Sequence, residues 1–382
     1  MQYRKFGKHD VQVSALGFGL MRLPILRDDP SKVDEKKTEE MVDYAIGQGV
    51  NYFDTAYVYH RGESEVVIGK ILRKGYRERV HLATKCPSWI IETAQDYDKY
   101  FGIQLERLQT DHIDMYLLHA LDKRRWPKLL KAGAFEFLDR AKSDGRIRFA
   151  GFSFHDDLGT FKTIVDSYDW DFCQIQYNYL DEEFQAGTQG LKYASERGLA
   201  VVIMEPLRGG RLAQNLPPEV QAVWTKAEPA RKPADWGLRW VWNHPEVSVV
   251  LSGMGEMWQV VENVNTAKSA LPNSLTPEEL SVYEGAKDAF RSRIRIGCTG
   301  CEYCLPCPQM INIPEWFQSY NYACMLGTLS SFGNDYERMR TDYGDLADCA
   351  KCGQCEEACP QSLAIRDHLD EILTHFRKSP ES

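Results

Sequence analysis

Short apolar runs alternate with amphipathic helical segments along roughly the first 270 residues of the chain. Each run is bounded by turn or polar residues, which is the pattern of buried strands joined by surface helices. The expected strands are Ala15–Phe18, Tyr52–Asp54, Val80–Thr84, Ile113–Leu118, Phe149–Phe152, Phe172–Gln176, Ala200–Met204 and Val247–Leu251. The expected helices are Glu35–Gly47, Ser64–Arg73, Ala94–Leu108, Leu129–Asp144, Leu158–Ser167, Ala186–Arg197, Ala234–Asn243 and Trp258–Ser269.

Eight strands, each followed by a helix, predict a (β/α)8 TIM barrel of the α/β class. A doubly wound sheet is the rival fold. It usually has fewer strands and carries a glycine-rich fingerprint after its first strand, of which Gly17-Phe-Gly19 is only a fragment. A small hairpin over residues 2–13 is expected before the first barrel strand, and no internal repeat beyond the β/α period is evident.

The chain changes character after the barrel pattern ends. Residues 272–277 are typical of a linker, and Thr276-Pro-Glu-Glu279 is a capping box that starts a helix running to about Arg293. After Gly297 the composition shifts to cysteine, proline and aromatic residues. We therefore expect a barrel domain over residues 1–296 and a second, smaller domain over residues 297–382.

Composition and charge narrow the class of protein. The 382 residues carry a net charge of -9, and the hydrophobic share of 43% is ordinary for a globular protein. This charge, without a run of Lys or Arg, argues against a nucleic-acid partner. No apolar run approaches the roughly 18 residues that span a bilayer, and the N-terminal residues lack the apolar core of a signal peptide. We expect no membrane partner and a cytoplasmic location.

Ionisable side chains stand at the ends of three consecutive expected strands. Asp54 closes the second strand, Lys85 follows the third and His119 follows the fourth, while Tyr59 lies in the loop after Asp54. Active sites of (β/α)8 barrels lie at the carboxyl ends of the strands, so these four side chains are expected to converge. Singly, each has a structural alternative: a helix cap, an exposed strand end, loop packing or a core histidine. Jointly, they favour a catalytic site.

The chemistry that these residues permit is acid–base catalysis by a phenol. A free tyrosine has a pKa of about 10, and a nearby Lys85 ammonium is expected to lower the pKa of Tyr59. Asp54 would keep Lys85 charged and oriented. His119 could hydrogen-bond a substrate carbonyl oxygen. Such a site protonates an oxyanion as hydride arrives, or deprotonates an alcohol as hydride leaves.

Four segments of the chain resemble the aldo-keto reductase family: Asn51–Tyr59, Gly62-Glu-Ser-Glu65, Leu82–Lys85 and Asp114–His119. The resemblance covers roughly residues 1–270. It implies a (β/α)8 barrel that binds NADP or NAD and interconverts a small carbonyl and an alcohol. The catalytic tetrad implied by the resemblance is Asp54, Tyr59, Lys85 and His119, with Tyr59 as the general acid.

The same resemblance implies a set of residues that contact the dinucleotide. Ser153 and Gln176 would lie near the carboxamide, Gly209 and Gly210 near the pyrophosphate, and Glu262 near the adenine. The full set is Gly19, Met21, Ser153, Gln176, Met204, Leu207, Gly209, Gly210, Gly253, Gln259, Glu262 and Asn263.

Two departures from the family pattern bear on the cofactor. Met204 stands where the family often has a tyrosine stacked on the nicotinamide, and a thioether packs less rigidly on a ring. Gly253, Met254 and Gln259 stand where many NADP-dependent members carry cations for the 2′-phosphate. The choice between NADP and NAD therefore stays open.

Nine of the 11 cysteines lie between Cys298 and Cys359. Such segregation is typical of metal binding rather than of disulfides. The later motif, Cys349-Ala-Lys-Cys352-Gly-Gln-Cys355-Glu-Glu-Ala-Cys359-Pro, matches the C-x2-C-x2-C-x3-C-P run of bacterial ferredoxins. The earlier motif is one residue shorter before its last cysteine. It reads Cys298-Thr-Gly-Cys301-Glu-Tyr-Cys304-Leu-Pro-Cys307-Pro.

This resemblance implies [4Fe-4S] clusters, with two more expected than one, in a small, mainly α-helical ferredoxin-like domain. In two-cluster ferredoxins the last cysteine of each motif ligates the other cluster. Carried over, Cys298, Cys301, Cys304 and Cys359 would hold one cluster, and Cys349, Cys352, Cys355 and Cys307 the other. Zinc is the alternative, although structural zinc prefers pairs of C-x2-C. Cys324, Cys86 and Cys173 are expected to be packing residues.

Two functions follow from these expectations. The first is an NAD(P)H-dependent oxidoreductase that interconverts a carbonyl and an alcohol by hydride transfer, fused to an electron-transferring [4Fe-4S] domain with a possible redox protein partner. The alternative is a non-hydride electron-transfer or redox-sensing module that docks a protein partner. Intact Asp54, Tyr59, Lys85 and His119 favour the first.

Overall fold

The computed structural model describes residues 1–333 and 336–377. The chain divides into two compact units. The first comprises Met1–Ala213 and Lys232–Thr276, and the second comprises Gln214–Arg231 and the chain from Pro277 onward. The expected boundary near residue 296 follows the change in composition, whereas these units divide at the linker before residue 277.

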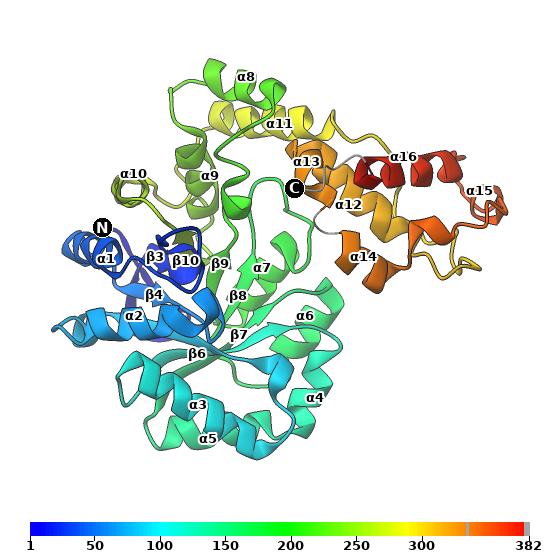
Figure 1. Cartoon of the computed structure of the whole chain (residues 1–382). Coiled ribbons are helices and arrows are strands. Elements are labelled where there is room, and N and C mark those ends of the chain that lie inside the picture. Colours follow the sequence, from blue (N-terminus) through cyan, green and yellow to red (C-terminus); the bar gives the residue numbers. More distant parts are fainter. Residues whose placement is uncertain (334–335, 378–382) are drawn as a thin grey trace. The chain divides into compact units, whose positions relative to one another are not determined.

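The first unit is built on a closed parallel barrel of eight strands in the order β10-β3-β4-β5-β6-β7-β8-β9, as the sequence pattern predicts (Figure 1). The strands are β3 (Leu16–Gly19), β4 (Tyr52–Asp54), β5 (His81–Cys86), β6 (Ile113–Leu121), β7 (Ile147–Phe154), β8 (Phe172–Gln176), β9 (Ala200–Met204) and β10 (Val247–Gly253). The helices of this unit are α1 (Glu35–Gly47), α2 (Glu63–Leu72), α3 (Ala94–Leu108), α4 (Arg125–Lys131), α5 (Ala134–Ser143), α6 (Leu158–Val165), α7 (Gly187–Glu196), α9 (Pro233–Trp242) and α10 (Met257–Ser269).

One expected helix of the barrel is divided in two. The apolar periodicity over residues 129–144 predicts one helix, but the chain forms α4 and α5 there. The break lies at Gly133, whose φ of 85° belongs to the left-handed region that glycine adopts without steric cost. Periodicity alone does not detect this break, because apolar positions continue on both sides of the glycine.

An N-terminal hairpin, β1 (Tyr3–Lys5) and β2 (Gln12–Ser14), precedes the barrel as expected. Phe6, in its turn, is fully buried, and its ring lies 5.4 Å from Phe149 and 5.3 Å from Phe172. These residues belong to one apolar cluster with inward-facing residues of the strands, such as Tyr52 and Val202. The hairpin therefore packs against the barrel interior and leaves the carboxyl ends of the strands for the site.

The second unit is helical. It contains α8 (Pro218–Lys226), α11 (Pro277–Arg291), α12 (Ile313–Leu326), α13 (Leu329–Phe332), α14 (Tyr336–Tyr343), α15 (Gln354–Glu357) and α16 (Ile365–Arg377). Helix α8, which the sequence pattern did not predict, packs on α11, with Trp224 and Tyr283 5.8 Å apart. No helix of the described residues is long and apolar enough to cross a membrane.

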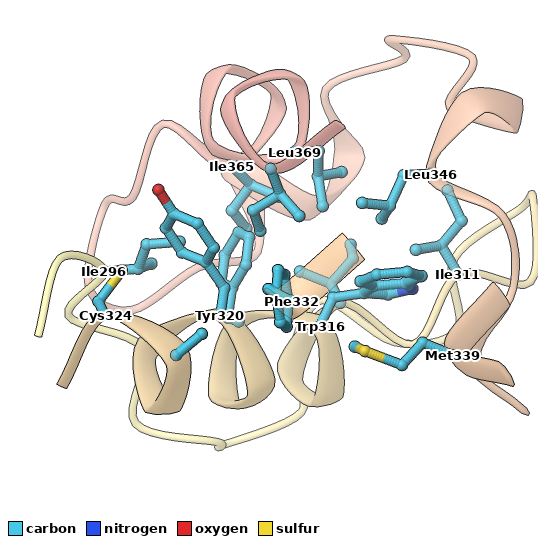
Figure 2. Packing of buried hydrophobic residues seen from close by; sticks show 14 residues of the cluster. Ile296, Ile311, Trp316, Tyr320, Cys324, Phe332, Met339, Leu346, Ile365 and Leu369 are labelled. Carbon is cyan, nitrogen blue, oxygen red and sulfur yellow. The ribbon is translucent and has the colours of Figure 1, made fainter. Parts of the chain in front are cut away.

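A separate hydrophobic core holds the cysteine-rich part of the second unit together. Figure 2 shows Trp316, Tyr320 and Phe332 facing Ile365 and Leu369 across this core. Cys324 is buried in the same core, as expected for a packing residue. Six of the expected ligand cysteines are partly buried against its edge: Cys298, Cys304, Cys307, Cys349, Cys355 and Cys359.

Candidate functional site

Three of the four expected tetrad residues meet at one ammonium group. The Lys85 Nζ donates to Asp54 Oδ1 at 2.6 Å, to the Thr55 carbonyl oxygen at 2.7 Å and to Tyr59 Oη at 3.3 Å. The Lys85 and Asp54 side chains are only 1% and 3% exposed. Because the phenol oxygen accepts this hydrogen bond, its own proton is left to donate elsewhere.

Strand register explains this convergence. Asp54 pairs with Ala83 across β4 and β5, so Lys85 extends two residues farther along the neighbouring strand. Tyr59 begins a short helical turn, Tyr59–Gly62. Its ring centroid lies 4.8 Å from the Lys85 Nζ. His119, near the end of β6, completes the group, with its ring 6.2 Å from that of Tyr59. The structure thus brings all four predicted side chains together.

Glu65, the last residue of the Gly62-Glu-Ser-Glu65 motif, stabilises the strand that carries Lys85 through buried hydrogen bonds. Its fully buried carboxylate accepts hydrogen bonds from Thr84 Oγ1 at 2.6 Å, Gln104 Nε2 at 2.8 Å and Arg107 Nη1 at 3.2 Å. Gln104 also donates to the Lys85 carbonyl oxygen at 3.0 Å. These bonds fix the strand that presents Lys85.

Burial sets the protonation states of the tetrad. Burial raises the pKa of Tyr59 above its ordinary value, and the opposing effect of Lys85 does not cancel it. The expectation of a net lowering was therefore wrong, because desolvation of the phenolate outweighs the ammonium. Burial also acts to lower the pKa of Lys85, but Asp54 and Tyr59 together raise it. At neutral pH the site holds a protonated phenol beside a charged lysine.

His119 is held neutral. Burial lowers its pKa well below the ordinary value, and the charge of Lys85 lowers it further. Its Nδ1 is buried without a hydrogen-bond partner among the described residues, so Nε2 is the ring nitrogen available to a ligand. Trp89, 43% exposed, lies with its ring 5.3 Å from His119 and supplies an apolar wall beside it.

The residues expected near a nicotinamide carboxamide lie on the two strands after β6: Ser153 on β7 and Gln176 on β8. Ser153 Oγ accepts from the Ala120 N–H at 2.7 Å, which leaves its hydroxyl proton free to donate. Gln176 Nε2 donates to Asp181 Oδ2 at 2.8 Å, which leaves its Oε1 to accept from an amide. This complementary donor and acceptor pair fits a carboxamide.

The residues expected along the dinucleotide lie at the ends of β3, β9 and β10. Gly19 pairs with both Asp54 and Gly253, so these three positions are contiguous at the carboxyl end of the barrel. Met21 is 53% exposed in the loop after β3. Met204 ends β9, and Gly210 in the following loop has open space where a side chain would stand. A glycine in open space lets a ligand approach the backbone closely.

Other expected cofactor contacts have structural partners. Leu207 packs at the position where a Gly237 β-carbon would stand, and Asn263 Nδ2 donates to Ser252 Oγ at 3.0 Å. Gln259 Oε1 accepts from the Gly255 and Glu256 N–H groups and caps α10, and Glu262 pairs with Lys232. The structure therefore gives these residues partners within the protein, and it does not show contacts that require a dinucleotide.

Sequence reasoning missed three charged residues near these positions. Arg22, in the loop after β3, lies against Gly209 and Gly253, and Glu205 lies close to Gly209. Lys232 reaches Glu262 from another segment of the chain. No motif marks them, because each reaches the site from a loop whose path the sequence does not specify.

The eight expected ligand cysteines line two pockets in the second unit. Cys298, Cys301, Cys304 and Cys359 line a narrow pocket of about 20 Å³. Cys307, Cys349, Cys352 and Cys355 line another, of about 210 Å³, which Cys304 also borders. Each pocket is thus lined by three cysteines of one motif and the last cysteine of the other, the grouping that two-cluster ferredoxins use.

The two cysteine motifs form a backbone repeat that the sequence alone did not reveal. Left-handed residues flank the second cysteine of both motifs, Gly300 and Glu302 in the first and Lys351 and Gly353 in the second. After each Cys-Pro-Gln another left-handed residue follows, and its N–H bonds to the cysteine carbonyl, as in Met310 to Cys307 at 2.9 Å. Such turns aim backbone N–H groups into concavities that suit anionic clusters.

The donor set fits iron–sulfur clusters better than zinc. Each pocket is lined by three cysteines at x2 spacing and a fourth from the other motif, whereas structural zinc prefers pairs of C-x2-C. Zinc needs four ligands on one ion, whereas a cubane binds each thiolate to a separate iron and spaces the sulfurs more widely.

Comparisons with known proteins agree with both halves of this geometry. Residues 15–278 match the aldo/keto reductase family, and residues 297–365 match the 4Fe-4S dicluster domain. The chain is 27% identical over 315 residues to L-galactose dehydrogenase of Arabidopsis thaliana, covering 76% of this chain and 96% of that protein. It is 25% identical over 308 residues to the NADH-specific methylglyoxal reductase of Escherichia coli, covering 68% and 91%.

A solved structure shows the same likeness. The holo form of aldo-keto reductase AKR11C1 from Bacillus halodurans superposes with a TM-score of 0.64 and 28% identity, covering 75% of this chain and 96% of that chain. The parallel barrel and the match over residues 15–278 lead to one conclusion. The chain belongs to the aldo/keto reductase family and carries a C-terminal 4Fe-4S domain.

Proposed function

We propose that the barrel reduces a small carbonyl compound with a hydride from NADPH or NADH, and that Tyr59 donates the proton. The observation that carries this proposal is the Lys85 ammonium, buried between Asp54 and Tyr59 at 2.6 Å and 3.3 Å. A bound dinucleotide supplies the hydride, which goes to the carbonyl carbon. The Tyr59 proton goes to the carbonyl oxygen, so the products are an alcohol and the oxidised dinucleotide.

Each tetrad residue has a separate task in this proposal. Lys85 stabilises the phenolate that remains after proton transfer, and Asp54 keeps Lys85 charged. Neutral His119 donates from Nε2 to the carbonyl oxygen and orients it toward Tyr59. Ser153 and Gln176 hold the carboxamide, and Met204 packs against the nicotinamide ring. Their positions support this assignment.

We also propose that the second unit binds two [4Fe-4S] clusters in a crossed arrangement, in which the last cysteine of each motif ligates the other motif's cluster, and exchanges electrons with a redox protein partner. The pockets lined by the eight cysteines support the cluster count. Cys301 and Cys352, the second cysteines of the two motifs, are exposed, which supports electron exchange at the surface. A hydride carries two electrons and each cluster exchanges one, so the tetrad's reaction does not require the clusters.

The pH dependence of turnover tests the barrel assignment. Reduction needs protonated Tyr59, whose pKa lies above its ordinary value of 10.0. With neutral His119, the reduction rate is expected to stay constant through neutrality and to fall only in strongly alkaline solution. Oxidation of the alcohol needs the phenolate, so its rate should rise with pH over the same range.

The measurement uses the anaerobically reconstituted full chain with NADH and NADPH in turn. The substrates include methylglyoxal for reduction and L-galactose for oxidation, the compounds named for two similar proteins. A reduction rate that falls by half between about pH 6 and 8 would indicate a proton donor with an ordinary histidine pKa and would exclude Tyr59.

A further inference from the structure

Arg22 crosses the carboxyl end of β10 from the loop after β3. A β-carbon placed on Gly253, the last residue of β10, would lie 3.2 Å from Arg22 Cδ. A β-carbon placed on Gly209, in the loop after β9, would lie 2.6 Å from Arg22 Nη2. Because β9, β10 and β3 are neighbours in the barrel, the side chain spans the positions where Gly209 and Gly210 are expected to approach a diphosphate.

The Arg22 guanidinium is available to an external anion. Among the described residues, it has neither a hydrogen bond nor an ion pair, and the side chain is exposed. Two other cations nearby are engaged. Arg208, next to Gly209, pairs with the buried Asp181 at 2.8 Å, and Lys232 pairs with Glu262. Arg211, which follows Gly210, is exposed, and its side chain also has no partner among the described residues. It is the Arg22 guanidinium, however, that the structure places against Gly209.

Glu205 places an opposing charge at the same point. The β-carbon position of Gly209 lies 3.7 Å from Glu205 Oε2. The Glu205 backbone has a φ of 53°, a left-handed conformation that is uncommon outside glycine, and Asn178 Nδ2 donates to its carbonyl oxygen at 3.2 Å. A carboxylate held here repels a dianion, so an anionic ligand over Gly209 needs a neutralising cation.

We propose that Arg22 binds the diphosphate of the nicotinamide dinucleotide over Gly209 and that Glu205 opposes it, so that this pair sets the affinity for the cofactor. The inference rests on the proposed function, because it requires that the barrel binds a dinucleotide. A planar guanidinium can donate two parallel hydrogen bonds to phosphate oxygens. Because the diphosphate is common to NADH and NADPH, this contact would not distinguish the two cofactors.

The test measures dissociation constants of NADH and NADPH by fluorescence titration of the anaerobically reconstituted full chain. Arg22→Met keeps most of the stem and removes the charge, and it should weaken both dinucleotides about 10- to 100-fold. Arg22→Lys should lie between, because it keeps the charge but not the planar fork. Arg27→Met, a charge-matched control on the same exposed loop, should stay within about twofold of wild type.

Glu205→Gln gives an expectation of opposite sign. Removal of the opposing charge should tighten dinucleotide binding about threefold, and the Arg22→Met/Glu205→Gln double variant should lie between the two single variants. Glu205 also raises the pKa of Tyr59, so the alkaline fall of the reduction rate should move to lower pH in Glu205→Gln. A merely structural role of Glu205 would not move this pH profile.

A hydride donor without phosphate distinguishes the role of Arg22 from the proposed carbonyl reduction itself. With reduced nicotinamide riboside, Arg22→Met should keep kcat/KM within about twofold of wild type, because no diphosphate is present. An Arg22→Met variant that binds NADH and NADPH as tightly as Arg27→Met would overturn the role of Arg22 and leave the proposed function intact. A folded wild-type barrel that binds neither dinucleotide would overturn both.

Discussion

Replacement of Tyr59 by phenylalanine is expected to lower kcat for carbonyl reduction about 1,000-fold, equivalent to about 4 kcal/mol of transition-state stabilisation. The phenol is buried, its oxygen already accepts from Lys85, and its raised pKa keeps the proton in place at neutral pH. Phenylalanine retains the ring against Lys85 and His119 but cannot supply that proton. The measurement is single-turnover oxidation of NADPH or NADH at saturating carbonyl substrate.

Two controls make this result specific. Dinucleotide affinity should stay within about twofold, because the hydroxyl acts on the substrate rather than on the cofactor. Tyr57→Phe removes the hydroxyl of a neighbouring tyrosine, whose ring centroid lies 4.4 Å from the Arg107 guanidinium carbon. This variant should keep kcat within about twofold. A Tyr59→Phe variant with more than about a tenth of the wild-type kcat would show that another group donates the proton.

Loss of one cysteine at the end of either motif is expected to remove one whole cluster. If both clusters assemble, the chain holds about eight iron atoms, and Cys359→Ala or Cys307→Ala should each reduce this to about four. The physical reason is that a cubane missing one of its four thiolates is exposed to solvent and is lost. Iron and acid-labile sulfide are measured after anaerobic reconstitution, together with the EPR signal after reduction by dithionite.

Double variants distinguish crossed from sequential ligation. In the crossed arrangement Cys359→Ala with Cys298→Ala affects one cluster and leaves about four iron atoms, whereas Cys359→Ala with Cys349→Ala affects both and leaves none. Sequential ligation gives the reverse pattern, which would contradict the grouping of cysteines around the two pockets. Cys324→Ala, in the hydrophobic core, is the control and should keep about eight iron atoms.

The barrel could be predicted almost completely from the sequence because its signals are local. Each strand is a short apolar run, and α1 and α3 begin and end where the apolar periodicity begins and ends. The division of one expected helix at Gly133 was not predicted, because apolar positions continue across it. Helix α8 was missed because it depends on packing against α11, which lies far along the chain.

The candidate site was predictable in part for the same reason. Asp54, Lys85 and His119 follow apolar runs, so the barrel geometry alone brings them together. The direction of the Tyr59 pKa was not predictable, because it depends on how deeply the phenol is buried. Arg22 and Glu205 escaped notice because their approach to Gly209 depends on loop backbones and not on strand register.

The central claim is that the barrel passes a hydride directly to a carbonyl carbon, and deuterium transfer tests it most directly. NADPH or NADH carrying deuterium at both C4 positions is mixed with the wild-type, cluster-loaded protein and a carbonyl substrate in ordinary water without oxygen. Mass spectrometry of the alcohol should show one deuterium on the carbinol carbon of each molecule. Alcohol without deuterium, formed while the dinucleotide is oxidised, would mean that the electrons travel singly and that the proposed chemistry is wrong.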